Sequence, residues 1–296
     1  MRTYTKDDII QIVEEEDVEF IRLQFTDMLG TLKNIAITAS QLPKALEHAC
    51  TFDGSCMEGF IWLEEEDMYL HPDPSTFEIF PWRPQQGKVA RLLCDVYKCD
   101  GTPFESDSRQ ILKRTIKRAQ EKGYTMEVGS ECEFFLFHMD EEGNPTTVTH
   151  ECAGYFDIDP MDFGENTRRD IVLTLEEMGF VIESSHHEVA PAQHEIVFRH
   201  SEALSAAGMD GIERKILPPS CIDEQEYREQ SQKLEETCRL PKSLLEAVEA
   251  FEQDELMQSV IGKELSQKYI QTKKREYREY CAQVTAWELE QYLYRI

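Results

Sequence analysis

The placement of proline and glycine divides this 296-residue chain into two regions of different character. Residues 67–104 carry five prolines and two glycines around one apolar strand, which the sequence predicts at 89–97. From Ser108 onward proline and glycine become less frequent, and the apolar residues of 109–123 have the spacing of a helix. Because a domain takes roughly 150 residues, we expect two domains with a boundary near Pro103, in the α+β class.

The region before Pro103 has the pattern of a small α+β domain. Apolar residues follow a helical stripe over 6–16, and strict alternation then begins at Val18. A short Met-Leu-Gly turn leads into a second alternating segment, so residues 18–38 are predicted to form a hairpin. A helix is predicted over 40–49.

The second region begins with a mixture of strands and helices and ends as nearly continuous helix. A strand is predicted at 131–139 and a helix at 167–179, capped by Asn166 or Thr167. A strand pair is predicted at 180–189 and 194–200. Further helices are predicted at 201–217, 241–262 and 263–281.

The charge balance excludes whole classes of partner. The chain has 31 Lys and Arg against 58 Asp and Glu, a formal net charge of −27. Such a chain repels nucleic acid and anionic membrane surfaces. No segment reads as a secretion signal or a membrane span, and the nine cysteines contain no C-x-x-C pair. We therefore expect free thiols and a cytoplasmic protein that binds neither nucleic acid nor membrane.

Two short segments concentrate carboxylates. Glu131 and Glu133 are two apart on a predicted strand, so both project from one face, about 6.5 Å apart, and could line one cavity. The alternative is that the two glutamates lie on a half-exposed edge strand and have no role in a site, as is the case for most such pairs. The segment SHHEVAPAQHEIVF adds Glu188 and Glu195, and Pro191 bends the chain between them. Taken alone, its His-His-Glu sequence is weak evidence for a metal.

Together these segments resemble a known family. E-C-E-F-F-L-F, Y-F-D-I-D-P, H-H-E-V-A-P-A-Q-H-E-I and the N-terminal F-D-G-S-C-M-E-G-F are similar to type I glutamine synthetase, which joins ammonia to glutamate with ATP through γ-glutamyl phosphate. The resemblance covers nearly the whole chain. It implies a β-grasp domain over 1–103 and a catalytic domain, an antiparallel sheet with helices, over 104–296.

The resemblance also implies a metal site. By similarity, Glu133, Glu188 and Glu195 would hold the divalent ion nearer the glutamate, and Glu131 would contribute to a second ion that bridges the ATP phosphates. Three carboxylates suit Mg²⁺ or Mn²⁺ better than zinc. ATP would be the cosubstrate, and glutamate and ammonia the other substrates.

Further site residues follow from the same resemblance. Asp53 and Cys56 match a loop that one subunit lends its neighbour to receive and deprotonate ammonium, although the family usually has Ser where Cys56 stands. Tyr155 matches a tyrosine lining the ammonium pocket. Asp53 and Glu188 are thus the catalytic candidates, and Tyr155 and Cys56 the substrate-binding ones. A shared active site implies a homo-oligomer, or a mixed oligomer with a full-length homologue.

The sequence departs from the family at one place above all. The segment before residue 205 runs straight into AGMDGI, whose counterparts lie far apart in full-length relatives, so an internal deletion is expected near 205–208. No histidine follows His200 and no asparagine follows Asn166. The second ion's histidine, its other carboxylate and the phosphate-binding arginines therefore have no counterparts. Ala192 is a smaller departure, at a position where the family commonly has glycine.

Three readings follow. The chain could be a glutamate–ammonia ligase by descent, with activity impaired in this short form. It could instead be a non-catalytic regulatory or assembly subunit of a full-length glutamine synthetase, or a deletion product without a selected function. Phosphoryl transfer depends on cations that neutralise the transferred phosphate, so for the isolated chain we favour the non-catalytic subunit. The sequence does not separate that reading from the deletion product.

Overall fold

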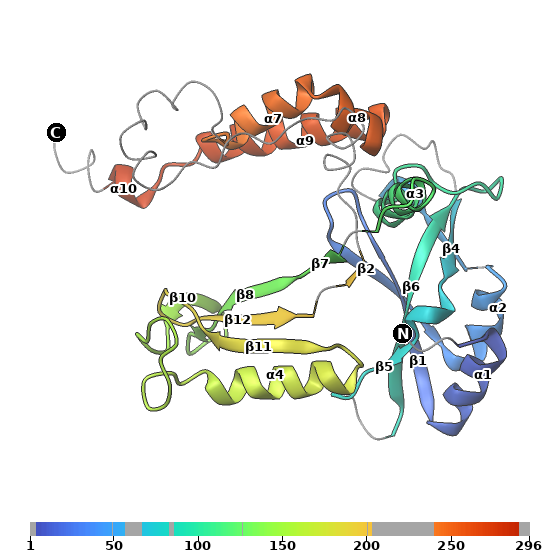
Figure 1. Cartoon of the computed structure of the whole chain (residues 1–296), viewed down its shortest axis with the longest axis horizontal. Coiled ribbons are helices and arrows are strands. Elements are labelled where there is room, and N and C mark those ends of the chain that lie inside the picture. Colours follow the sequence, from blue (N-terminus) through green and yellow to red (C-terminus); the bar gives the residue numbers. More distant parts are fainter. Residues whose placement is uncertain are drawn as a thin grey trace.

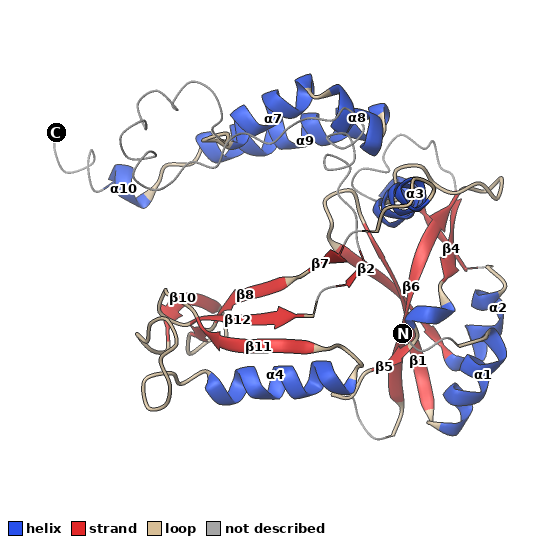
Figure 2. Ribbon diagram, viewed as in Figure 1, coloured by secondary structure: helices blue, strands red, loops and turns tan. Residues whose placement is uncertain are grey.

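The computed structural model describes residues 4–48, 50–56, 67–82, 86–125, 127–199, 201–202 and 240–289. Figure 1 shows three parts: an N-terminal sheet with helices α1 and α2, a second sheet lined by helix α4, and a group of C-terminal helices. Helices and strands both contribute to the first two parts, as Figure 2 shows by colour. The α+β class predicted from the sequence is confirmed.

The N-terminal sheet has the strand order β2-β1-β6-β4-β3, with β5 pairing to β6. Its central pair, β1 and β6, is parallel, and its other pairs are antiparallel. Its strands are β1 (Val18–Thr26), β2 (Leu32–Thr38), β3 (Cys50–Asp53), β4 (Asp67–Pro72), β5 (Glu78–Ile79) and β6 (Lys88–Tyr97). The helical elements of this region are α1 (Lys6–Glu15), η1 (Ala39–Gln41), α2 (Leu42–Leu46), η2 (Gly54–Cys56) and η3 (Pro74–Thr76).

One hydrophobic core holds this sheet against α1 and α2. Ile9 of α1, Leu23 of β1 and Leu92 of β6 are all fully buried. Each such side chain stabilises the fold by roughly 1.5–3 kcal/mol. Helix α1 begins at a capping box, in which the Thr5 and Asp8 side chains each accept the other's backbone N–H.

The sequence predicted this region well, with one omission. The hairpin over 18–38 is confirmed by the antiparallel pairing of β1 with β2. The expectation of a single strand within 67–104 is wrong, because β4 and β5 also lie there. The prolines obscured β4, which ends at Pro72, where a ladder tolerates the missing N–H.

Helix α3 (Ser108–Gln120) is fastened to the N-terminal sheet by buried polar groups. The Asp107 carboxylate accepts the backbone N–H of Arg109 at the helix start and of Val96 on β6. The Arg109 guanidinium then donates to Asp95, at 2.7 Å, and to Asp73, at 2.5 Å. Lys113 of the same helix adds a second cation, 2.6 Å from Asp95, so two basic side chains neutralise the two partly buried carboxylates where the two regions meet.

The second sheet has three antiparallel strands in the order β11-β12-β8. They are β8 (Glu131–Phe135), β11 (Ile182–His187) and β12 (Gln193–Phe198). Helix α4 (Glu165–Glu177) packs on β11 and β12, and Figure 1 shows it running alongside β11. Two small strand pairs accompany this sheet: β7 (Glu127–Val128) with β13 (Ser201–Glu202), and β9 (Phe137–Met139) with β10 (Pro145–Thr149).

Two details of this part differ from expectation. The strand predicted over 131–139 is divided at Leu136 into β8 and β9. The cap predicted at Asn166 or Thr167 is wrong, because Gly164 occupies the N-cap of α4 and no side chain caps it.

The C-terminal helices form a separate layer that touches α3 through α8. The helix predicted over 263–281 is confirmed as α9, whereas the one predicted over 241–262 is divided at Asp254, which caps α8. These helices are α7 (Leu244–Gln253), α8 (Glu255–Ile261), α9 (Lys263–Cys281) and the short α10 (Ala286–Glu288). None of the described helices has the length and apolar character needed to cross a membrane. The helix predicted over 201–217 and the expected junction at 205–208 lie outside the described residues.

The Arg109 clamp yields a stability prediction. We expect Arg109→Met to lower the free energy of unfolding by about 2 kcal/mol, because it removes both guanidinium contacts and leaves Lys113 as the remaining cation beside Asp73 and Asp95. Urea denaturation measures the change. Arg114→Met is the matched control, since Arg114 on the same helix donates to a single exposed backbone carbonyl. Equal loss in the two variants would contradict the clamp.

Candidate active site

The strand register gathers acidic side chains on one face of the second sheet. Glu195 of β12 pairs with Glu133 of β8 on one side and with His186 of β11 on the other. Glu131 lies two residues before Glu133, on the same face. Glu188 follows the end of β11, and the turn after it brings its backbone N–H to the carbonyl of Gln193, at 2.7 Å. The turn therefore places Glu188 beside Glu195, as the bend at Pro191 predicted.

His186 bridges the two glutamates. Its Nε2 lies 3.0 Å from Glu188 Oε1 and 3.1 Å from Glu195 Oε2. One donor atom from each of these three residues lies within 4.8 Å of the other two, which is the spacing of ligands around one metal ion. The Glu188 carboxylate is further held by the backbone N–H of Val189, at 2.9 Å.

The electrostatics of the Glu188 and Glu195 carboxyl groups favour binding of a cation. Burial, a hydrogen bond shared with Glu188 and the charge of Glu131 raise the pKa of Glu195. The Val189 amide, His186 and the shared hydrogen bond lower the pKa of Glu188. The two opposite shifts arise because the two carboxyl groups lie close together and interact, as adjacent carboxylates do. A divalent cation between them would relieve their mutual repulsion.

The remaining carboxylates of this face are oriented differently. Glu133 is exposed, and its Oε2 accepts a hydrogen bond from Gln193 Nε2, at 2.7 Å. Glu131 is also exposed and acts on Glu195 through its charge. In this arrangement His186, rather than Glu133, completes the group of three closest donors with Glu188 and Glu195.

Sequence reasoning missed His186 as a member of this group. The signal was present in the His-His-Glu segment, because alternation along β11 sends His186 to the face of Glu195 and His187 to the opposite face. The pairing of β11 with β12 was needed to recognise that His186 stands beside Glu195.

Aromatic rings border the cluster. The Tyr155 ring stacks on Phe156, with centroids 3.9 Å apart, and meets His186 edge to face at 5.6 Å. Tyr155 itself is 53% exposed. The structure therefore places Tyr155 beside His186, with about half of its side chain exposed.

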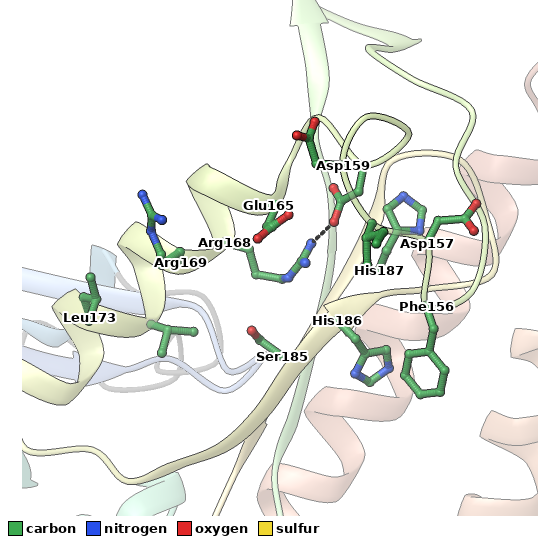
Figure 3. A pocket seen from close by; sticks show the side chains of 13 residues that line it. Phe156, Asp157, Asp159, Glu165, Arg168, Arg169, Leu173, Ser185, His186 and His187 are labelled. Carbon is green, nitrogen blue, oxygen red and sulfur yellow. Dashed lines mark ion pairs between the residues drawn. The ribbon is translucent and has the colours of Figure 1, made fainter.

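A cavity of about 620 Å³ adjoins the cluster through His186. It lies between β11, α4 and the segment 156–162, and Figure 3 shows Arg168 reaching from α4 toward β11, with its ion pair drawn to Asp162. Its volume is in the range of small-molecule sites. Its lining is mixed, with Phe156 and Leu173 among charged side chains.

Asp53 and Cys56 lie elsewhere, in the N-terminal region. Asp53 ends β3, and its Oδ1 accepts hydrogen bonds from the backbone N–H and the hydroxyl of Ser55, at 2.9 and 2.6 Å. Cys56 ends the short helix η2. Asp53 therefore belongs to a different sheet from the one that bears the glutamates, and Cys56 lies in the short helix that follows it.

The turn between Glu188 and Glu195 shows why the family commonly has glycine at the position of Ala192. Ala192 has φ of 57°, a left-handed conformation that glycine adopts without strain. Its carbonyl accepts the N–H of Leu136, which ties the turn to the end of β8. Position 192 therefore favours glycine because its backbone is in the left-handed conformation.

Comparison with known proteins identifies both regions. The family model described as the glutamine synthetase β-grasp domain matches residues 17–99. The model described as the glutamine synthetase catalytic domain matches residues 105–207 and 203–292.

Among curated relatives, the glutamine synthetase of Clostridium saccharobutylicum is 63% identical over 207 residues, which cover 70% of this chain and 47% of that protein. That of Staphylococcus aureus strain MW2 is 59% identical over 206 residues, which cover 69% and 46%. The chain thus spans about half the length of these relatives.

Solved structures agree on the fold. A structure described as "Apo GmaS without ligand" superposes with a TM-score of 0.83 at 19% identity, over 97% of this chain and 99% of that one. The cryo-EM structure of Plasmodium falciparum glutamine synthetase has a TM-score of 0.56 at 23% identity, over 73% of this chain and 48% of that one. At these identities the likeness concerns the fold alone.

The close contact between Gly164 and His194 yields the second prediction. Gly164 stands so close to His194, the neighbour of Glu195, that an added Cβ would lie 2.3 Å from the ring. We expect Gly164→Ala to destabilise the chain by about 2 kcal/mol through overpacking, as measured by thermal or urea unfolding. Gly154→Ala is the matched control, because a Cβ there would meet only Asp157, at an ordinary 3.7 Å. Equal stability of the two variants would contradict this packing.

Proposed function

Because this chain belongs to the glutamine synthetase family, we propose that it keeps one divalent-cation site and acts as a subunit that completes the active site of a full-length relative. The observation that carries the cation site is the group of Glu188, Glu195 and His186, whose donor atoms lie within 4.8 Å of one another. The family is generally dependent on ATP and a divalent metal.

The residues present fit such an ion. Glu188 and Glu195 would hold it with His186, and Glu133 is one strand away and would join by leaving Gln193. Carboxylate oxygens suit Mg²⁺ and Mn²⁺, and an imidazole nitrogen among them favours Mn²⁺. When bound, the ion would supply positive charge that attracts a carboxylate substrate such as glutamate. Tyr155 would border the place where ammonium enters.

We propose that the chain alone does not ligate ammonia to glutamate. Transfer of the γ-phosphoryl group of ATP depends on a second cation and on arginines that meet the phosphates. In the described part of the chain, no arginine forms an ion pair with Glu131, Glu133, Glu188 or Glu195. Arg168, the buried arginine of α4, is paired with Asp162 on the opposite face of the sheet. With Glu131 as its one family ligand here, the second ion lacks a complete site.

The proposed domain division is 1–103 for the β-grasp domain and 104–296 for the catalytic domain, with an internal deletion near 205–208. It is supported by the catalytic-domain match in two segments that meet at 203–207. We also propose a reducing cytoplasm as its location, where cysteines such as Cys50, Cys94 and Cys132 would stay free thiols.

The subunit role rests on what the chain keeps and what it lacks. It keeps the β-grasp sheet and the Asp53 loop, which by family resemblance is lent to a neighbour and receives ammonium. It lacks counterparts for much of the receiving half. Such a subunit would complete a neighbour's site without having its own completed.

Cation binding is the first test. We expect calorimetric titration with Mn²⁺ to show one site, and Glu195→Gln to abolish it. Affinity should fall as the pH is lowered, because the raised pKa of Glu195 means that the ion must displace a proton. Glu183→Gln on β11 is the charge-matched control, since Glu183 is exposed near the start of the strand and lies outside the group of three donors. Two equal sites, or an unchanged site in Glu195→Gln, would contradict the proposal.

Mixed assembly is the second test. The chain should be co-expressed with the Clostridium saccharobutylicum glutamine synthetase, and particles analysed by native mass spectrometry and glutamine formation. We expect mixed particles whose activity falls in proportion to the short chain, while the short chain alone forms no glutamine. Asp53→Ala in the short chain should lower activity about 100-fold or more at each site that receives its loop.

Asp100→Ala provides a matched control for that substitution. Asp100 accepts the N–H and hydroxyl of Thr102 at 2.9 and 2.6 Å, the same local turn that Asp53 makes with Ser55. Failure of the two chains to share a particle would overturn the subunit role and favour a deletion product. Glutamine formation by the short chain alone, absent in Glu133→Gln, would overturn the non-catalytic reading.

A further inference from the structure

A buried polar layer lies behind the carboxylates, on the face of the sheet that α4 covers. Its centre is His187, which is fully buried. The Nε2 of His187 lies 2.9 Å from Glu151 Oε1, and its Nδ1 lies 2.6 Å from the backbone carbonyl of Glu188. The other Glu151 oxygen accepts the backbone N–H of Ala153. One imidazole thus connects a buried carboxylate to the peptide of a proposed metal ligand.

The partners define the protonation of this ring. A carbonyl oxygen only accepts, so Nδ1 carries hydrogen and donates to Glu188. Burial opposes charge on both side chains, but the contact with Glu151 raises the pKa of His187, and the hydrogen bonds from His187 and Ala153 lower that of Glu151. Each of the two buried side chains is therefore satisfied at both of its polar atoms, which is the condition under which polar groups are tolerated in a buried layer.

The Glu188 peptide is held on both sides. Its N–H donates to the carbonyl of Gln193 at 2.7 Å, and its carbonyl accepts from His187. Two contacts then orient the side chain: Val189 N–H to Oε2 at 2.9 Å and His186 to Oε1 at 3.0 Å. The direction in which the carboxylate leaves the backbone depends on the peptide that His187 anchors.

We propose that Glu151 and His187 are positioning residues for the cation site: their buried pair fixes the Glu188 peptide so that its carboxylate meets Glu195 and His186. This inference rests on the proposed cation site. Groups that orient metal ligands from behind typically contribute 10–100-fold to metal affinity.

The buried layer is not itself a metal site in this arrangement. Asp162, His187 and His194 offer donors within 4.8 Å of one another. However, the Arg168 guanidinium already lies 2.9 Å from His194 Nδ1 and 2.9 Å from Asp162 Oδ2, and both His187 nitrogens are engaged. Nε2 of His194 faces Gly164, where even a Cβ would lie 2.4 Å away. A fixed cation and close packing thus leave no room for an ion.

The test uses the full chain and two measurements, Mn²⁺ affinity and amide hydrogen exchange. His187→Leu and Glu151→Gln should raise the Kd for Mn²⁺ by 10–100-fold. His187→Asn should recover part of the loss, because its amide nitrogen can occupy the place of Nδ1 and donate to Glu188. Asp162→Asn, in the same buried layer but without contact to Glu188, should change Kd by less than about threefold if the effect belongs to positioning.

Amide exchange separates this inference from the proposed function. In metal-free protein, the amides of the turn 188–193 should exchange faster in Glu151→Gln and His187→Leu than in the parent, while those of β6 stay unchanged. An unaltered turn would overturn the inference, and so would a loosened turn with unchanged Mn²⁺ affinity. If the parent binds no Mn²⁺, the proposed cation site fails, and the exchange rates alone then judge whether the pair holds the turn. Equal losses in His187→Asn and His187→Leu, with Asp162→Asn also impaired, would show a general packing role and overturn positioning.

Discussion

The antiparallel register of β8, β12 and β11 is the constraint on which this site depends. It sets Glu133, Glu195 and His186 side by side on one face. On the other face the same register aligns Phe134, His194 and His187. Because strand side chains alternate, a slip of one residue in β12 would move Glu195 to the face of the buried layer and His194 to the face of the carboxylates. The carboxylate cluster and the buried polar layer therefore both result from the pairing of β12 with β8 and β11.

The buried layer reinforces this register. His194 and His187 are fully buried, and each has a charged partner, Arg168 and Glu151 respectively. Leaving either partner unsatisfied in the interior would cost more than a typical hydrogen bond contributes, so the layer disfavours alternative pairings. Gly164 allows α4 to begin directly against His194, which brings Arg168, one turn further on, to both His194 and Asp162. The helix and the sheet are consequently aligned by polar contacts as well as by apolar ones.

Much of this architecture was predictable from the sequence, because local patterns determine it. Alternation predicted β1, β11 and β12, and helical spacing predicted α3 and α9. What sequence could not supply was pairing between distant segments. His186 joined the glutamates only once β11 was placed against β12, and His187 reached Glu151 across 36 positions. The division of residues 241–262 at Asp254 was also missed, because an acidic cap inside an amphipathic stretch resembles surface polarity.

The outer strands of the second sheet carry opposing features that bear on assembly. In the described part of the chain, β8 and β11 each pair with β12 alone, and exposed glutamates such as Glu131, Glu133 and Glu183 lie along them. Charges on edge strands oppose indiscriminate pairing with other chains. Beside these charges, Phe135 and Phe137 stack on one another while nearly half exposed, an apolar surface of the kind that interfaces cover. The charges on these edge strands therefore disfavour extension of the sheet, while the exposed rings of Phe135 and Phe137 supply apolar surface for packing of side chains.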